Sequence, residues 1–108
     1  MGFTAEYQEA QPERAEIDAL PGPVLVEVGS PTCGHCRRAR PLIEAAMQSH
    51  PGVRHVKVAD GKGRPFGRTF GVKLWPTLVF LKDGAVVETL VRPTDEAGIV
   101  AALERIDR

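Results

Sequence analysis

Apolar and polar residues alternate with two different periods along this chain, which predicts strands in some stretches and helices in others. Four short runs are rich in β-branched or apolar residues and have the length of strands. They are residues 24–28, 53–59, 77–81 and 85–90. The first run is apolar on both faces except for Glu27, as is typical of a central strand. Lys82-Asp83-Gly84 separates the last two runs and predicts a tight hairpin.

Four other stretches have a helical pattern: residues 5–19, 33–50, 64–70 and the segment after Thr94. In the second, apolar residues recur at helical spacing, at Cys36, Ala39, Ile43, Ala46 and Met47. The first should be best formed after Pro12, with Ala15 and Ala19 packing inward. We expect Gly71 to end the third helix and Thr94 to cap the fourth.

The predicted elements follow the order α-β-α-β-α-β-β-α. This order implies an α/β protein with a central mixed sheet and helices on both faces. No internal repeat, low-complexity segment or linker divides the 108 residues. We therefore expect a single domain over residues 1–108, with one core.

Charge and cysteine content exclude several classes of protein. The 14 basic and 14 acidic residues cancel, so no global field favours nucleic acid or an anionic membrane. No apolar stretch is long enough to span a bilayer, and two cysteines do not make a disulfide-stapled secreted scaffold. The N-terminal residues lack a basic start followed by an apolar segment. The expected location is therefore the cytoplasm, unless an export signal has been removed.

The two cysteines, Cys33 and Cys36, are spaced for reversible disulfide chemistry. Residues three apart on a helix have Cβ atoms about 5–6 Å apart, and a disulfide needs about 4 Å, so a small adjustment closes the bond. Cys33 stands at the predicted start of a helix, where unpaired N–H groups and the helix dipole lower the thiol pKa from about 8.5. Cys36 lies one turn deeper on the buried face, which suits a thiol that resolves a mixed disulfide.

The two residues between the cysteines bear on this reaction. Gly34 keeps the approach to the sulfur open. His35, if protonated, would add positive charge beside the sulfur, favour the thiolate over the disulfide and make the pair more oxidising. Taken alone, His35 would be an ordinary exposed helix histidine, and only its place between the cysteines favours a tuning role.

A zinc site and a purely structural disulfide are two alternatives for this motif. A closed zinc site needs four ligands, and His35, His50 and His55 show no paired metal spacing. A disulfide across three residues closes a tiny loop and stabilises little in the chain-entropy model. The spacing therefore favours a redox pair and predicts no metal ligand.

Glu27 is the second informative residue, because a carboxylate inside an apolar strand is costly to bury. It could lie at a sheet edge or strand end and reach water. Alternatively it is a buried acid behind the cysteines, with a pKa raised by desolvation, that takes the proton from Cys36. Lys57 lies in a comparable strand and could pair with Glu27 across neighbouring strands, or be a solvated strand lysine.

Trp75-Pro76-Thr77 completes a set of motifs that together resemble the thioredoxin family. A proline at the entry of a strand is by itself a plain strand start. Here it follows the cysteine pair by about forty residues, and Pro41 lies inside the helix that begins at the pair. The resemblance runs from about residue 24 to the C-terminus and fits the first helix more loosely.

The resemblance implies a thioredoxin fold and a role for each cysteine. Cys33 would be the attacking, partly exposed thiol, and Cys36 the buried resolving thiol. Pro76 would be a cis proline packed against the pair, and the backbone of Trp75 would hydrogen-bond an extended substrate strand.

The resemblance also bears on the acid and on the residues between the cysteines. Glu27 occupies the position of the family's buried acid, which is usually aspartate but is glutamate in disulfide-isomerase domains. Lys57 matches the lysine that is often near that acid. Gly34-His35 is the dipeptide of disulfide isomerases, whereas thioredoxins proper carry Gly-Pro.

Four positions depart from the family's usual pattern. Thr32 stands where tryptophan is usual, Gly29 where a second aromatic residue is expected, and Arg92 where the family uses a surface glycine to dock partners. Trp75, at a position that is usually small or aliphatic, could supply the aromatic surface lost at Thr32. We expect Thr32, Gly34, Trp75 and Arg92 to contact substrate, and a partner set that differs from that of a standard thioredoxin.

The sequence thus predicts a thioredoxin-fold thiol–disulfide oxidoreductase with a four- to five-stranded sheet. We expect a monomer that reduces protein disulfides, receives electrons from a thiol reductase and uses no cofactor beyond its own cysteines. Couples of this kind span about −270 to −120 mV, and the Gly-His dipeptide argues for a value above the reducing end. Two alternatives are an oxidase or isomerase in an oxidising compartment, and a non-catalytic metal-binding or interaction module of the same fold.

Overall fold

The computed structural model describes residues 2–108 of the chain. Its elements follow in sequence order as α1 (Arg14–Asp18), β1 (Pro23–Gly29), α2 (Gly34–Met47), β2 (Arg54–Ala59), η1 (Phe66–Phe70), β3 (Thr77–Lys82), β4 (Ala85–Val91) and α3 (Glu96–Ile106). The predicted order is confirmed, except that the third helical segment, η1, is a short 3₁₀ helix. Gly71, at φ 72°, ends it in the left-handed region, as predicted for a closing glycine.

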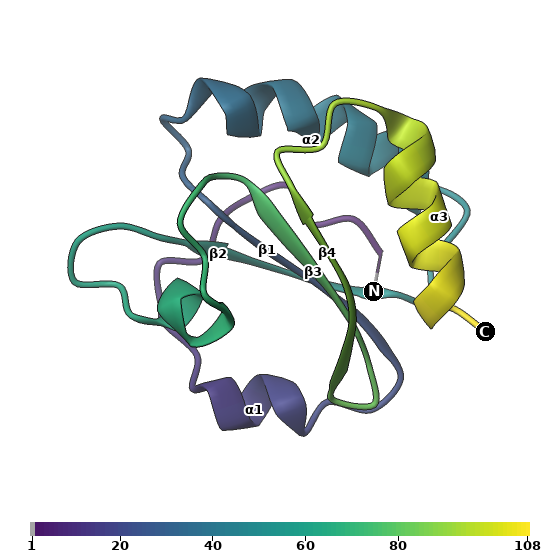
Figure 1. Cartoon of the computed structure of the whole chain (residues 1–108), viewed down its shortest axis with the longest axis horizontal. Helices are drawn as coiled ribbons and strands as arrows, with labels where there is room; N and C mark the ends of the chain where they lie inside the picture. Colours follow the sequence, from purple (N-terminus) through teal and green to yellow (C-terminus); the bar gives the residue numbers. More distant parts are fainter. Residues whose placement is uncertain (1) are drawn as a thin grey trace.

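The four strands form one mixed sheet in the order β2-β1-β3-β4 (Figure 1). Strand β1 pairs in parallel with β2 and antiparallel with β3, and β3 pairs antiparallel with β4. The apolar run at residues 24–28 therefore lies in the interior of the sheet, as its pattern predicted. The end of β1 leads directly into the turn before α2, which places the cysteines just beyond the C-terminal end of this central strand.

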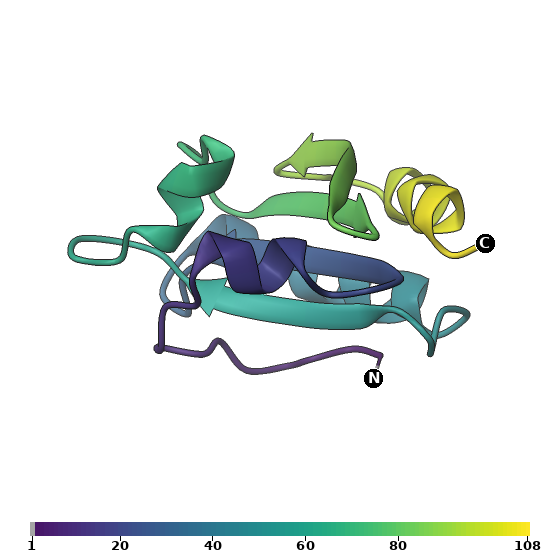
Figure 2. The ribbon, with the colours of Figure 1, turned by 90° about the horizontal axis from the view of Figure 1, so that it is seen from below.

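Helices cover both faces of the sheet, α2 and α3 on one side and α1 and η1 on the other (Figures 1 and 2). Side chains alternate between these layers along β1. Leu25 packs in the core beneath α2 and α3, whereas Val24 and Val26 pack in the core on the opposite face. Glu27 shares the direction of Leu25, because strand side chains alternate with a period of two. The carboxylate therefore points toward the layer that holds the cysteines.

The prediction of a helix over residues 5–19 is wrong for most of that range, because only Arg14–Asp18 is helical. The chain before it runs extended along the outer edge of β2 (Figure 2). There, the Gln8 N–H donates to the Lys57 carbonyl at 2.8 Å, and the Ala59 N–H donates to the Gln8 carbonyl at 3.0 Å. These bonds satisfy backbone groups that β2 would otherwise expose, which outweighs the weak helical preference of the segment.

The short helix α1 also faces differently from the prediction. Ala15 and Ala19, expected to pack inward, are exposed, and Ile17 is the buried residue of the helix. The helix begins after Glu13, whose side chain forms a reciprocal capping box with Glu16, rather than at Pro12.

The other boundaries shift by a few residues. Helix α2 ends at Met47 rather than near residue 50. Helix α3 is capped by Asp95 and not by Thr94, because the Asp95 side chain accepts a 2.7 Å hydrogen bond from the Gly98 N–H. The hairpin between β3 and β4 is confirmed, with φ of 48° at Asp83 and 83° at Gly84, as a two-residue turn with both central residues left-handed requires.

Candidate active site

The two cysteines lie at the start of α2, just beyond the end of β1. Cys33 is the N-cap residue of the helix, in an extended conformation, and is partly exposed. Cys36 lies one turn further on the inward face and is only 3% exposed. Both are free thiols. The same motif therefore presents one accessible sulfur and one buried sulfur.

The start of the helix shifts the pKa of the Cys33 thiol below its ordinary value. Desolvation of the sulfur acts in the opposite direction, but it is outweighed by hydrogen bonds. These come from the backbone of Cys36 and His35 and from the Cys36 thiol, and the positive charge of Arg92 adds to them. The predicted direction of the shift is confirmed, because backbone N–H groups at a helix start stabilise an anion.

The pKa of the Cys36 thiol moves in the other direction. Burial raises it most, and the neighbouring Cys33 raises it further. Hydrogen bonds from the backbone of Ser30 and from the Tyr7 hydroxyl oppose this effect without cancelling it. Near neutral pH, Cys33 is thus the thiol with the larger thiolate fraction, and Cys36 holds its proton.

Glu27 is fully buried, with 0% exposure, so the alternative of a carboxylate that reaches water is excluded. Lys57 lies directly opposite it across the β1–β2 pair and is 3% exposed. The Lys57 Nζ is 3.8 Å from Glu27 Oε2, and it also donates to the Ala5 carbonyl at 2.9 Å. The pairing of Glu27 with Lys57 across neighbouring strands is therefore present, and the solvated lysine is excluded.

His55 is a member of this buried group that the sequence interpretation missed. Its Nε2 lies 2.9 Å from Glu27 Oε1, and both side chains are fully buried. Its Nδ1 accepts a hydrogen bond from the Thr4 N–H at 2.9 Å, so the proton of the ring sits on Nε2 and is donated to Glu27. His55 stands two residues before Lys57 in a strand, and this period of two was the available signal.

Tyr7 is the second residue that the sequence interpretation missed. Its hydroxyl lies 3.5 Å from Glu27 Oε2, and its ring lies 4.4 Å from Lys57 Nζ. The N-terminal segment beside β2 brings it there, and the wrong helix prediction for that segment hid this placement. No sequence signal pointed to it.

Gly29 leaves the space in which Tyr7 and Cys36 meet. A Cβ atom at Gly29 would lie 2.7 Å from Cys36 Sγ and 2.8 Å from the Tyr7 hydroxyl oxygen. Both distances are shorter than contacts that carbon atoms make in folded proteins, so a side chain at this position would displace one of them. Gly29 departs from the family pattern, and the Tyr7 hydroxyl lies where a side chain at position 29 would begin.

The loop before β3 faces the accessible sulfur. The Trp75–Pro76 peptide bond is cis, and the Trp75 carbonyl oxygen is 3.9 Å from Cys33 Sγ. The indole of Trp75 turns away and donates to Asp60 Oδ2 at 2.9 Å. Thr32, by contrast, is exposed, and its hydroxyl lies 3.0 Å from that of Ser30.

Arg92 also reaches this loop. Its Nε donates to the Trp75 carbonyl at 2.8 Å, and its backbone N–H donates to the Pro76 carbonyl at 2.9 Å. Its φ of 50° lies in the left-handed region that favours glycine. The arginine therefore holds a strained backbone position beside the cysteine pair.

The expectation that a protonated His35 supplies the charge beside Cys33 is corrected by the structure. Desolvation, together with the positive charges of Arg92 and Arg38, lowers the pKa of His35. Its Nδ1 lies 2.9 Å from Arg38 Nη2, an atom that can only donate, so Nδ1 acts as the acceptor. The positive charge that acts on Cys33 is that of Arg92.

The thioredoxin family model matches residues 6–105, almost the whole chain. The chain belongs to the thioredoxin family. Its sequence is 33% identical to thioredoxin 1 of Synechococcus elongatus over 84 residues, which cover 77% of this chain and 78% of that protein. It is also 36% identical over 102 residues to protein disulfide-isomerase A3 of Gallus gallus, but the match covers 94% of this chain and only 19% of that protein.

Solved structures agree with the sequence relatives. The reduced form of thioredoxin 2 from Pseudomonas aeruginosa superposes with a TM-score of 0.86 at 46% identity, over 96% of each chain. A mutant form of thioredoxin from Halobacterium salinarum superposes with a TM-score of 0.75 at 25% identity, over 94% of this chain and 89% of that one. The fold is therefore the thioredoxin fold, and the chain is a thiol–disulfide oxidoreductase.

Membership of the family also indicates the general class of partner. Thioredoxins act on protein disulfides, receive electrons from a reductase and need no cofactor. Within residues 2–108, no cluster of three or more His, Cys, Asp or Glu side chains is arranged to hold a metal ion. None of the helices described for this thioredoxin-family chain combines the length and apolar character that crossing a membrane requires.

Proposed function

We propose that this chain reduces protein disulfides, with Cys33 as the attacking thiol and Cys36 as the resolving thiol. The observation that carries the proposal is the opposite shift of the two pKa values, downward at accessible Cys33 and upward at buried Cys36. An attacking thiol must be ionised and reachable, whereas a resolving thiol must stay protonated until the mixed disulfide has formed.

The proposed reaction has two steps, attack by Cys33 and resolution by Cys36. The Cys33 thiolate attacks one sulfur of the substrate disulfide, forms a Cys33–substrate disulfide and releases the other sulfur as a thiolate. Cys36 then loses its proton and attacks Cys33 Sγ. The Cys33–Cys36 disulfide forms, the second substrate sulfur leaves as a thiolate, and a reductase returns two electrons to the pair.

Glu27 is the proposed acceptor of the Cys36 proton. It is the buried carboxylate on the side of the sheet that faces the cysteines, and Lys57 and His55 hold its two oxygens. Lys57 and His55 serve as positioning residues for the carboxylate.

The loop at Trp75 and Pro76 is the proposed wall of the substrate groove. Its carbonyl at Trp75 faces Cys33, and Thr32 and Gly34 border the sulfur along the chain. An extended substrate peptide can hydrogen-bond to exposed backbone groups, which gives affinity, and the side chains around them then set which substrates bind. Arg92, which already occupies the Trp75 carbonyl, is part of this surface.

The second candidate function is oxidation or isomerisation of disulfides in an oxidising compartment. The charge of Arg92 and the backbone bonds to Cys33 favour the thiolate, and a stabilised thiolate makes the disulfide a stronger oxidant. We favour net reduction in a reducing cytoplasm, at a potential between about −270 and −120 mV. Equilibration with glutathione buffers measures the reduction potential and so separates the two functions. A potential close to the oxidising end of this range would support the oxidase or isomerase.

Trapping of substrates tests the assignment of roles. Cys36→Ser removes the resolving thiol, so mixed disulfides with protein substrates should accumulate on Cys33 and be released by added reductant. Cys33→Ser is the matched control, which retains Cys36 but should trap little, because Cys36 is buried. Equal trapping by both variants would show that the roles assigned here are wrong.

A further inference from the structure

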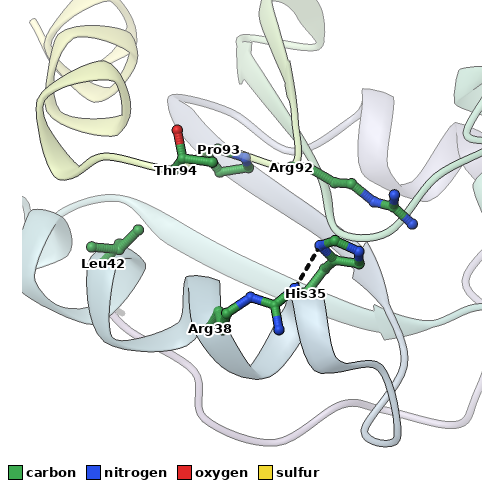
Figure 3. A pocket seen from close by; sticks show the side chains of 6 residues that line it. All are labelled: His35, Arg38, Leu42, Arg92, Pro93 and Thr94. Carbon is green, nitrogen blue, oxygen red and sulfur yellow. Dashed lines mark hydrogen bonds between the residues drawn. The ribbon is translucent and has the colours of Figure 1, made fainter.

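A cavity of about 420 Å³ opens beside α2, the helix that begins after Cys33 (Figure 3). Its lining comes from α2 and from the segment between β4 and α3. The lining residues are His35, Arg38, Leu42, Arg92, Pro93 and Thr94. None of these is acidic and two of them are arginines, so the lining is positively charged, and Leu42 and Pro93 add apolar surface.

The two arginines have no carboxylate partner among residues 2–108. The ion pairs of the described chain involve other basic residues. Arg92 uses its Nε to hold the Trp75 carbonyl, and Arg38 uses one Nη to hold His35. A guanidinium carries five N–H donors, so both side chains keep donors for an anion.

The backbone of Arg92 supports a functional role. Arg92 has a φ of 50°, and a residue with a Cβ is strained in this left-handed region, whereas glycine is not. An observed strained residue at the rim of a site is a reason to look for function. Here this backbone conformation places the Arg92 guanidinium against the Trp75 carbonyl and in the lining of the cavity. Figure 3 shows it on the side of the cavity where His35 lies.

The cavity is tied to the reacting sulfur by short connections. His35 lies two residues after Cys33 in the sequence. Arg92 binds the same Trp75 carbonyl that lies 3.9 Å from Cys33 Sγ. The cavity therefore lies next to the position of the disulfide under attack, where a neighbouring side chain of the substrate can enter it.

We propose that this cavity is a subsite for an acidic side chain of the protein substrate, close in sequence to the half-cystine that Cys33 attacks. Arg92 and Arg38 bind the carboxylate, and Leu42 and Pro93 contact the methylene groups that carry it. The inference rests on the proposed function and adds a substrate preference to it. Substrates with an acidic residue beside the reactive cystine are thus reduced faster.

Matched peptides test this subsite. A series of peptides with one internal disulfide carries a single Glu at successive positions on either side of the attacked cysteine, each paired with the same peptide carrying Gln. We expect the wild-type chain to reduce one or two of the Glu peptides about fivefold faster in kcat/KM, as one exposed ion pair of about 1 kcal/mol would give. The preference should fall with added salt.

Three variants complete the test. Arg92→Gln and Arg38→Gln should each lower the Glu-to-Gln ratio, and Arg92→Gly should do the same while relieving the left-handed backbone. Arg37→Gln is the matched control, because it removes an equal charge from the same helix at a residue that does not line the cavity. The ratio cancels any general change in Cys33 reactivity.

Two results would overturn the subsite. The first is a wild-type chain that treats Glu and Gln peptides alike at every position. The second is a preference that Arg37→Gln removes as fully as Arg92→Gln, which would show long-range attraction only. Failure of the proposed function is distinct, because the Gln peptides would then not be reduced either.

Tyr7 carries a second inference from a separate observation. Glu27 is the proposed proton acceptor, yet the groups that shift the pKa of Cys36 most include the Tyr7 hydroxyl and not Glu27. The same hydroxyl lies 3.5 Å from Glu27 Oε2. The hydroxyl and Cys36 Sγ both border the space that Gly29 leaves free, at 2.8 and 2.7 Å from the position a Cβ would take there. Tyr7 therefore stands between the thiol and the carboxylate.

We infer that Tyr7 relays the Cys36 proton to Glu27 during resolution of the mixed disulfide. Cys36 gives its proton to the Tyr7 oxygen as Tyr7 gives its own to Glu27 Oε2, so that tyrosine stays neutral. The Cys36 thiolate then attacks Cys33 Sγ and the substrate thiolate leaves. A concerted transfer suits this residue, because burial and its hydrogen bond with Cys36 hold the pKa of Tyr7 well above its ordinary value.

The relay is tested on the resolving step alone, and it too rests on the proposed function. Cys33 is first converted to a mixed disulfide with thionitrobenzoate, and attack by Cys36 releases the coloured thiolate. Tyr7→Phe keeps the ring against Lys57 but removes the hydroxyl. We expect release to be roughly tenfold slower near neutral pH, a modest effect for acid–base catalysis. The difference should vanish at high pH, where solvent hydroxide ionises Cys36.

Glu27→Gln should give the same dependence on pH, because it removes the final acceptor. An unchanged release rate in Tyr7→Phe would overturn the relay. An equal slowing at every pH would also overturn it, since that result indicates a displaced Cys36 rather than a lost proton path. The rate at which Cys33 first attacks the probe disulfide is measured separately in each variant, so that the release rate reports the resolving step alone. A wild-type chain whose Cys33 does not attack the probe at all would instead contradict the proposed function.

Discussion

At the residue scale, the positive charge that stabilises the Cys33 thiolate comes from Arg92 and not, as the sequence suggested, from His35. The cysteine spacing and the helix start were sufficient to predict a lowered pKa at Cys33. The source of the neighbouring charge was not predictable, because Arg92 lies 59 positions after Cys33 in the numbering of the chain and approaches only through the β4–α3 segment. A histidine between two cysteines is visible in a sequence, whereas an arginine folded against them is not.

Charge removal should separate these two residues. Arg92→Gln is expected to raise the pKa of Cys33, because it deletes a positive charge that stabilises the thiolate. His35→Gln should change it less, because the pKa of His35 is lowered and its ring adds little charge near neutral pH. Ultraviolet absorbance of the thiolate during a pH titration, in a Cys36→Ser background, measures both. A larger effect of His35→Gln would contradict the assignment.

Gly29 offers a second test at this scale. Gly29→Ala places a Cβ less than 3 Å from both Cys36 Sγ and the Tyr7 hydroxyl, so one of them must move. We expect a loss of about 1–3 kcal/mol in the free energy of unfolding, as overpacking of a core gives, and slower resolution of mixed disulfides. Gly52→Ala is the control, since a Cβ there meets nothing within 4 Å. Urea denaturation compares the two.

At the scale of elements, periodicity predicted the strands and α2 well and the N-terminal segment poorly. The four strands and α2 have strong patterns, because each must bury one or both faces. The segment before α1 has helical composition but little apolar periodicity. Its structure follows from hydrogen bonds with residues of β2 that are about fifty positions away in the sequence. Local preference lost to these tertiary contacts, and Tyr7 was missed for the same reason.

The cap of α3 was also misplaced by one residue, and this difference is measurable. Asp95→Ala removes the side chain that accepts from the Gly98 N–H and should cost about 1 kcal/mol in the free energy of unfolding. Thr94→Ala is the matched control and should cost less, because the Thr94 side chain does not cap the helix. Thermal or urea denaturation of both variants checks the order. An equal loss would return the cap to Thr94.

At the scale of the whole molecule, the fold sets the two sulfurs in different surroundings although only two residues separate them. Strand β1 carries Glu27 beneath α2, the N-terminal segment covers it, and the Trp75 loop and Arg92 approach from the other side. The sequence predicted this architecture, and it predicted that Glu27 could be buried and paired with Lys57. It could not predict the groups that complete the site, because they come from segments far apart in the chain.

The central claim is that Cys33 attacks and Cys36 resolves. It rests on the pKa values of the two thiols, because the fold lowers that of Cys33 and raises that of Cys36. Alkylation of the reduced chain by iodoacetamide across a range of pH, with mass spectrometry to follow each cysteine separately, tests this claim most directly. We predict that Cys33 reacts first and that its rate rises at a pH below the ordinary range of a thiol, while Cys36 reacts only at higher pH. Equal rates at the two cysteines, or faster reaction at Cys36, would contradict the claim.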